Sequence, residues 1–164
     1  MTHDTLMTHD TLGTHDTLGT HDDAALFERL MARVRADGGG FGHREHVHLT
    51  WLAVQQVGMP AALALVGDGI RRTATAAGAP GKYHVTLTRA WVELVAHHAP
   101  GREPGDRADF ADFADRHAEL FDKRLLDRHY RPETLASPRA RAEWVEPDLT
   151  PLPRSADRRY CDGT

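Results

Sequence analysis

Three histidines have a spacing that fits a metal site. His43 and His46 lie three residues apart in the stretch GHREHVHLTW, so a helix places both rings on one face, one turn apart. His84, in GKYHVTLTRAW, falls on the inner face of a second expected helix, in a first turn that favours the neutral imidazole a metal requires. Three imidazoles that leave a coordination position open are typical of a catalytic metal site. The sequence therefore predicts a divalent transition metal held by these three histidines.

The ligand type limits the metal and the reaction. Neutral imidazoles suit Zn, Cu, Fe or Ni and disfavour Mg and Ca, which prefer oxygen ligands. A zinc-bound water serves hydrolysis, hydration or elimination, whereas copper or iron can bind oxygen or a chelating substrate. We therefore expect a small metal-dependent enzyme that acts on a small-molecule substrate: a lyase or hydrolase with Zn, an oxidoreductase with Cu or Fe. The alternative is a non-catalytic helical module that binds a small ligand or a metal.

Other polar residues take supporting roles in this hypothesis. Thr50, Tyr83 and Thr88 each place a hydroxyl on or beside the inner helix faces, where they can orient a substrate. His117 follows a stripe of phenylalanines and is the reserve ligand. The helical faces direct His48, Thr86 and His97 outward. They do the same for the helical carboxylates, which favours three histidines over two histidines and a carboxylate, although a loop carboxylate stays open; these carboxylates are Glu45, Asp68, Glu93, Asp112 and Glu119.

Apolar periodicity predicts the helices that position these residues. The first begins at a cap on Asp22 or Asp23 and ends at Gly38; the others span about 43–57, 60–77, 82–98 and 110–121. Residues 83–88 also alternate like a strand, but the continuation AWVELVAHH fits only a helix. Short helical turns are expected at Pro132 and Pro138, followed by an extended PDLTPLP tail. The predicted fold class is all-α, a compact bundle of four or five helices.

The chain begins with a repeat. MTHDTL, MTHDTL, GTHDTL and GTHDDA follow one another in six-residue steps, and each unit offers only one Leu or Ala to bury. We expect residues 1–21 to be a disordered low-complexity segment and residues 22–164 to form a single helical domain.

Composition excludes several classes of protein. Residues 1–22 carry the whole net charge of −4, and the remaining chain is formally neutral, without the basic excess of nucleic-acid binders. Cys161 is the only cysteine of 164 residues, which excludes an internal disulfide or a thiolate metal cluster. Because no apolar stretch approaches the roughly 20 residues of a membrane span, we expect a cytoplasmic protein without nucleic-acid or membrane partners. Whether it forms a homo-oligomer stays open.

The strings GHREHVHLTWL, GKYHVTLTRAW and DKRLLDRHYRPETLASP occur together between residues 41 and 150. In this combination the chain resembles a family of small uncharacterised bacterial helical proteins with HREHxxLxW and KYHxTxTxxW motifs. The resemblance implies a helical fold but no particular chemistry. An acidic residue often follows the histidine of the KYH motif in that pattern, whereas this chain has Val85.

Overall fold

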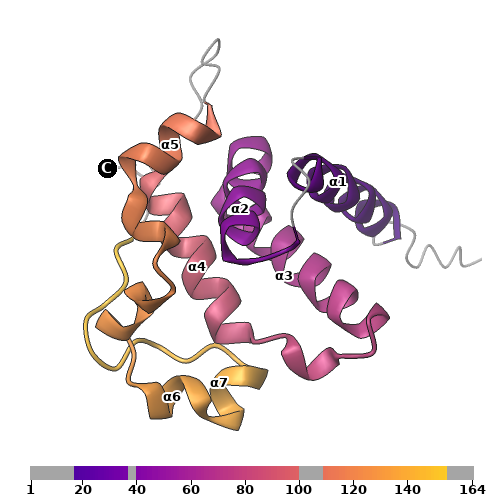
Figure 1. Cartoon of the computed structure of the whole chain (residues 1–164). Coiled ribbons are helices and arrows are strands. Elements are labelled where there is room, and N and C mark those ends of the chain that lie inside the picture. Colours follow the sequence, from indigo (N-terminus) through magenta and orange to yellow (C-terminus); the bar gives the residue numbers. More distant parts are fainter. Residues whose placement is uncertain (1–16, 37–39, 100–108, 155–164) are drawn as a thin grey trace, which may run out of the picture.

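The computed structural model describes residues 17–36, 40–99 and 109–154, and every regular element in them is a helix. The predicted all-α class is therefore confirmed for the described residues, where five α-helices have seven residues or more. In chain order the elements are α1 (Thr17–Arg35), α2 (His43–Val57), α3 (Met59–Ala76), the 3-10 helix η1 (Pro80–Lys82), α4 (Val85–His98), α5 (Phe110–Arg116), the 3-10 helices η2 (Ala118–Phe121) and η3 (Lys123–Arg128), α6 (Pro132–Ala136) and α7 (Pro138–Ala142). In Figure 1, α1, α2 and α3 lie to the right of α4, α5 lies near the upper end of α4, and α6 and α7 lie near its lower end.

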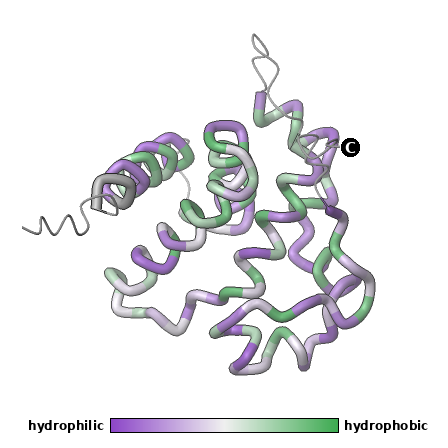
Figure 2. Tube along the Cα trace, turned by 180° about the vertical axis from the view of Figure 1, so that it is seen from behind, coloured by the Kyte–Doolittle hydropathy of each residue, from purple (hydrophilic) through white to green (hydrophobic). Residues whose placement is uncertain are grey.

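The first four helices share one apolar core. Apolar and polar residues alternate along each of them (Figure 2), as helices that bury one side require. The core residues that these helices contribute are Phe27, Leu30, Met31, Val34, Val47, Leu49, Trp51, Leu52, Ala53, Ala62, Leu65, Val66, Ala90, Val92, Leu94 and Val95. The core thus joins α1 to α4 into one packed unit.

Glycine and proline set the boundaries of α2 and α3 as expected. Gly58 ends α2 with a φ of 77°, a backbone conformation that residues other than glycine rarely adopt. Pro60 lies in the first turn of α3. The first helix differs from its prediction. It begins at Thr17, inside the repeat, and not at a cap on Asp22 or Asp23. The repeat was expected to be disordered over residues 1–21, but residues 17–21 belong to α1; residues 1–16 lie outside the described residues.

The start of α4 also differs from the prediction. Pro80 begins the short helix η1 instead of a loop, and the chain is extended at Tyr83 and His84 before α4 starts at Val85. Of residues 83–88, which alternate like a strand, the first two are extended and the other four are helical. His84 is the residue that caps α4, and it does not lie in the first turn as expected.

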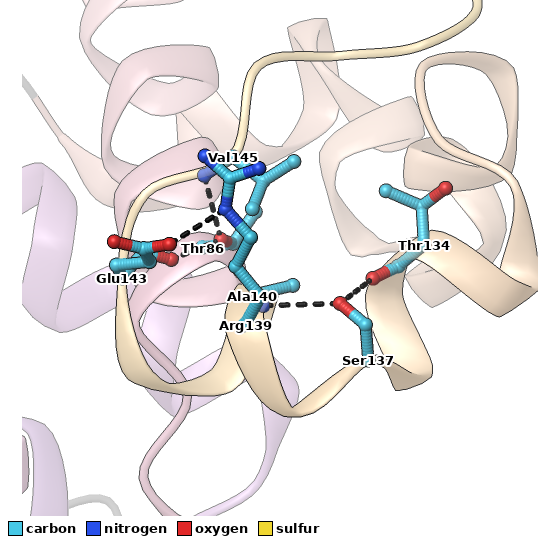
Figure 3. A network of polar contacts seen from close by, with 7 residues as sticks. All are labelled: Thr86, Thr134, Ser137, Arg139, Ala140, Glu143 and Val145. Carbon is cyan, nitrogen blue, oxygen red and sulfur yellow. Dashed lines mark hydrogen bonds and ion pairs between the residues drawn. The ribbon is translucent and has the colours of Figure 1, made fainter.

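The C-terminal segment packs against α4. Ser137 caps α7, as predicted, by accepting a hydrogen bond from the Ala140 N–H, and its own hydroxyl donates to the Thr134 carbonyl (Figure 3). Thr86 of α4 donates to the Glu143 carbonyl and accepts from the Val145 N–H, at 2.7 and 3.1 Å. The prediction that Thr86 points outward is therefore wrong, because the chain after α7 covers that side of α4.

The chain after α7 is not helical as far as residue 154, as predicted, and side chains of the two residues His129 and Tyr130 hold it in place. The Tyr130 hydroxyl donates to the Val145 carbonyl, and the His129 Nδ1 donates to the Thr150 carbonyl at 2.8 Å. Both rings are buried, and Leu152 of the tail is buried with them. These contacts fix the C-terminal segment against the bundle.

Helices α1 and α3 approach closely at Gly69. A methyl group at this position would overlap the ring of Phe27. We expect Gly69→Ala to lower the free energy of unfolding by about 1–3 kcal/mol, the usual cost of overpacking a core. Gly67→Ala in the same helix is the control, because its added carbon would lie 3.3 Å from the Tyr83 hydroxyl, the movable end of a side chain, and alanine favours the helix by about 1 kcal/mol. Urea unfolding measures both, and an equal response of the two variants would contradict this packing.

Candidate functional site

A pocket of about 540 Å³ lies among α1, α2, α3 and α4. All six residues that the sequence singled out line it: His43, Thr50 and His46 from α2, Thr88 from α4, and Tyr83 and His84 from the segment before α4. Most of the remaining lining is apolar and consists of Phe27, Met31, Phe41, Val47, Val66, Ile70, Ala74, Ala77, Ala79, Leu87 and Trp91. We call this the α1–α4 pocket.

Both ring nitrogens of His84 are bonded to the backbone. Nδ1 accepts a hydrogen bond from the Leu87 N–H at 3.2 Å, which caps α4, and Nε2 lies 2.8 Å from the Leu135 carbonyl oxygen. Because a backbone N–H only donates and a carbonyl only accepts, the ring is the neutral tautomer that carries its proton on Nε2. His84 therefore lines the pocket without offering a nitrogen lone pair to a metal.

His43 is also bonded to a distant carbonyl. Its Nε2 donates to the Leu120 carbonyl at 2.9 Å, and its ring meets the edge of Trp91. Burial lowers the pKa of His43 and outweighs the raising effect of the bond to Leu120. The charge of Lys123 lowers this pKa further, and those of Asp122 and Glu45 raise it. The ring is thus neutral at neutral pH, with its lone pair on Nδ1.

His46 has the opposite tautomer. Its Nδ1 donates to the Gly42 carbonyl at 3.3 Å, and its ring packs against Phe41. Burial lowers its pKa as well, against the raising effect of the Gly42 bond. The lone pair therefore lies on Nε2.

These bonds determine what the three histidines can offer to a ligand. No partner of the His43 Nδ1 or the His46 Nε2 occurs among the described residues. Every side-chain nitrogen or oxygen that is shielded from solvent in the described residues has a hydrogen-bond partner. Because these two atoms have none, they must be accessible to solvent. In their present orientation the three rings do not bring one nitrogen each within 4.8 Å of one another. Among the described residues, the one group of three that does so with its ligand atoms is His98, His117 and Glu119. In this arrangement the pocket presents two imidazole acceptors, the His43 Nδ1 and the His46 Nε2, while both nitrogens of His84 are engaged by the backbone.

The three hydroxyls that the sequence singled out differ in what they bind. Thr50 is buried and donates to the His46 carbonyl at 2.8 Å within α2. Thr88 and Tyr83 are half-buried at the pocket, and no protein partner of either hydroxyl occurs in the described residues. Burial raises the pKa of Tyr83, so its phenol stays protonated and can donate. Tyr83 and Thr88, but not Thr50, can therefore orient a ligand.

Sequence reasoning missed two lysines of this site. Lys82 and Lys123, both exposed, line the pocket, and they are the only lysines in the chain. No aspartate or glutamate is among the described lining residues. The signal was present in the composition, but nothing in the sequence indicates that positions 41 residues apart meet at one pocket.

A second group of polar residues lies near the C-terminal end of α4. His98, His117 and Glu119 each offer a ligand atom, and these atoms lie within 4.8 Å of one another. Glu119 is exposed, as its outward direction predicts, but it lies close to both histidines. Burial and the neighbouring His117 and His97 lower the pKa of His98. We call this group the histidine–glutamate cluster.

His48 departs from its predicted exposure. Its ring stacks on Phe110 with centroids 3.9 Å apart, because α5 packs on the side of α2 that was expected to face solvent. It lies outside the lining of the α1–α4 pocket.

Comparisons with known proteins found no match for this chain: no protein family profile, curated protein or solved structure matches it. The resemblance to an uncharacterised bacterial family thus rests on the quoted motifs alone. Among the described residues, none of the helices has the length and apolar character needed to cross a membrane.

The two bonds of His84 predict a graded loss of stability on substitution. His84→Ala removes the cap of α4 and leaves the Leu135 carbonyl without its donor, a combined cost of about 2–3 kcal/mol. His84→Asn retains a capping side chain and should cost about half as much. Urea unfolding with and without EDTA checks this result. A cost of His84→Ala that disappears in EDTA would indicate a metal ligand instead.

The lowered pKa values of His43 and His46 predict a loss of stability in acid. The unfolded chain takes up protons at these residues near pH 6.5, whereas the folded chain resists protonation until a lower pH. Above about pH 6.5 both rings are neutral in the folded and the unfolded chain, so they do not reduce the free energy of unfolding. This free energy falls as the pH drops from about 6.5 through the lower pKa values of the folded chain. The double variant His43→Gln, His46→Gln should show a shallower fall in unfolding free energy between pH 7.5 and 5. An unchanged slope would contradict the assignment.

Proposed function

We propose that the chain is a small-ligand-binding module whose α1–α4 pocket takes an apolar organic anion. The observation that supports this most is the composition of the lining: two lysines, no aspartate or glutamate among the described lining residues, and a mainly apolar remainder. This is the non-catalytic alternative of the sequence analysis, with the chemical class of the ligand added.

The size and lining favour the apolar part of the ligand. A volume of about 540 Å³ lies within the range of about 300–1,000 Å³ of pockets that enclose a small organic molecule. Aromatic and aliphatic side chains of α1, α2, α3 and α4 surround it. Burial of apolar ligand surface contributes roughly 25 cal/mol per Å², so a ligand of this size can be held mainly by its hydrocarbon part.

The charged and polar lining residues favour an anionic group. Lys82 and Lys123, which both line the pocket, supply positive charge at its surface. Tyr83 and Thr88 add hydroxyl donors. A cationic ligand would meet no opposite charge in the described lining.

The two imidazole acceptors add a further preference. The His43 Nδ1 and the His46 Nε2 are neutral acceptors, so they suit a hydroxyl or amide donor on the body of the ligand. A ligand with one anionic group and one donor would use all the free polar groups described above.

The metal-dependent enzyme is supported less well by the same geometry. A metal bound by His43, His46 and His84 would require His84 to break its bond to Leu87 or to Leu135. That rearrangement would remove the cap of α4 or the bond to the C-terminal segment. The described pocket can bind a small molecule without any such change.

Competition for a fluorescent probe tests the proposal. The anionic dye 8-anilinonaphthalene-1-sulfonate should bind the full chain with increased fluorescence. Decanoate should displace it at lower concentration than decanol, and decyltrimethylammonium should be the weakest competitor. Exposed charges contribute about 0.2–1 kcal/mol each, so the double variant Lys82→Gln, Lys123→Gln should weaken decanoate several-fold and leave decanol unchanged.

Two control variants locate the binding. Arg124→Gln removes a neighbouring exposed charge that does not line the pocket and should leave decanoate unaffected. Ala74→Trp places a large ring in the pocket lining and should abolish binding, whereas Ala76→Trp, on the exposed side of α3, should not. Equal effects of the two tryptophans, or equal affinity for decanoate and the ammonium compound, would contradict the proposal.

A further inference from the structure

The histidine–glutamate cluster brings together donors from three elements. His98 ends α4, His117 follows α5, and Glu119 lies in η2. No residue of the cluster lines the α1–α4 pocket, and Trp91, the last residue of α4 that does, lies seven residues or about 10 Å of helix before His98. It is therefore a site distinct from the pocket.

We propose that His98, His117 and Glu119 bind one divalent transition-metal ion, with zinc as the best match. Two imidazoles and one carboxylate are an established zinc ligand set, and the half-exposed position leaves room for water to complete the coordination. This proposal is independent of the pocket proposal, since no residue is shared.

The distances are close to those of a coordinated ion. Zinc–ligand bonds of about 2.0–2.1 Å in tetrahedral geometry place neighbouring ligand atoms about 3.4 Å apart. A Glu119 carboxylate oxygen lies 3.7 Å from the His117 Nδ1 and 4.0 Å from the His98 Nε2. Small side-chain rotations would therefore bring all three atoms to one ion, without movement of the helices.

The surroundings favour a cation at this position. The last carbonyls of α4 give the C-terminal end of the helix a partial negative charge, and His98 lies in its last turn. The His98 and His117 rings are 4.7 Å apart between centroids, so both face the same space. Among the described residues, the Glu119 carboxylate lies within 4.0 Å of the nitrogens of these two histidines and of no arginine or lysine.

Thermal unfolding with zinc tests the site. The repeat contains four more histidines, and imidazole is a zinc ligand, so the background is the full chain with His3, His9, His15 and His21 replaced by glutamine. One equivalent of ZnCl₂ should raise its melting temperature and continue to do so logarithmically with free zinc, because the ion binds the folded chain. Isothermal titration should give one ion per chain.

Single variants in that background assign the ligands. His98→Ala and His117→Ala should abolish the zinc-induced rise, each measured against its own zinc-free melting temperature. Glu119→Gln, an isosteric change at an exposed residue, removes the charged ligand and should markedly lower the zinc affinity while the fold stays intact. His97→Ala is the matched control, since the His97 Nδ1 donates to the Arg154 carbonyl and the residue is not in the cluster, and it should keep the full rise. No rise in the background chain, or a loss with His97→Ala equal to that with His117→Ala, would overturn the proposal.

Discussion

The two hydrogen bonds of His84 hold together the parts of the structure on which the pocket depends. One bond caps α4 through Leu87, and the other reaches Leu135, 51 residues later, so a single neutral ring fixes both the start of α4 and the position of α6. Thr86 adds a second connection to the chain that follows α7. Tyr83, Thr88 and Trp91 therefore reach the pocket from a segment whose start is bonded through two residues to the C-terminal part of the chain.

The same use of histidine recurs across the molecule. His43 bonds the carbonyl of Leu120, 77 residues away, and His129 bonds that of Thr150. In each case a half-buried or buried imidazole donates a hydrogen bond to a backbone carbonyl. Without that bond, removing the carbonyl from water would destabilise the fold. His43 and His84 thus join α2 and the start of α4 to later elements, and His129 joins the turn before α6 to the tail. These bonds give the histidines a structural role that needs no metal. The histidine–glutamate cluster is different, because its side chains face one another.

The fold could be predicted largely from local signals. Gly58, Pro60 and Ser137 mark helix boundaries through backbone conformation and capping, which depend on a few neighbouring residues only, and these boundaries are confirmed. The start of α4 could not, because whether Tyr83 continues a helix or stays extended depends on the bond from His84 to Leu135. The outward directions predicted for Thr86 and His48 were wrong for a related reason. A helical wheel assumes one buried side, whereas these helices are covered on a second side by later elements.

The candidate site shows the same division. The helical-face argument placed His43, His46 and His84 at one cavity, together with Thr50, Tyr83 and Thr88, and all six line the pocket. The argument could not foresee which atoms of each ring would be engaged, because their partners, the Leu120 and Leu135 carbonyls, belong to segments far away in the chain. The lysines and Glu119 were missed because their neighbours are defined by tertiary packing alone.

The hydrogen-bonded state of the three pocket histidines can be measured directly. Long-range ¹H–¹⁵N NMR correlations of the imidazoles distinguish the two neutral tautomers and the metal-bound ring. At pH 7.5 the account predicts the proton on Nε2 in His43 and His84 and on Nδ1 in His46, with all three patterns unchanged when zinc is added. Loss of the Nε2 proton pattern of His84 together with shifts of His43 and His46 on zinc addition would contradict it and restore the three-histidine metal centre.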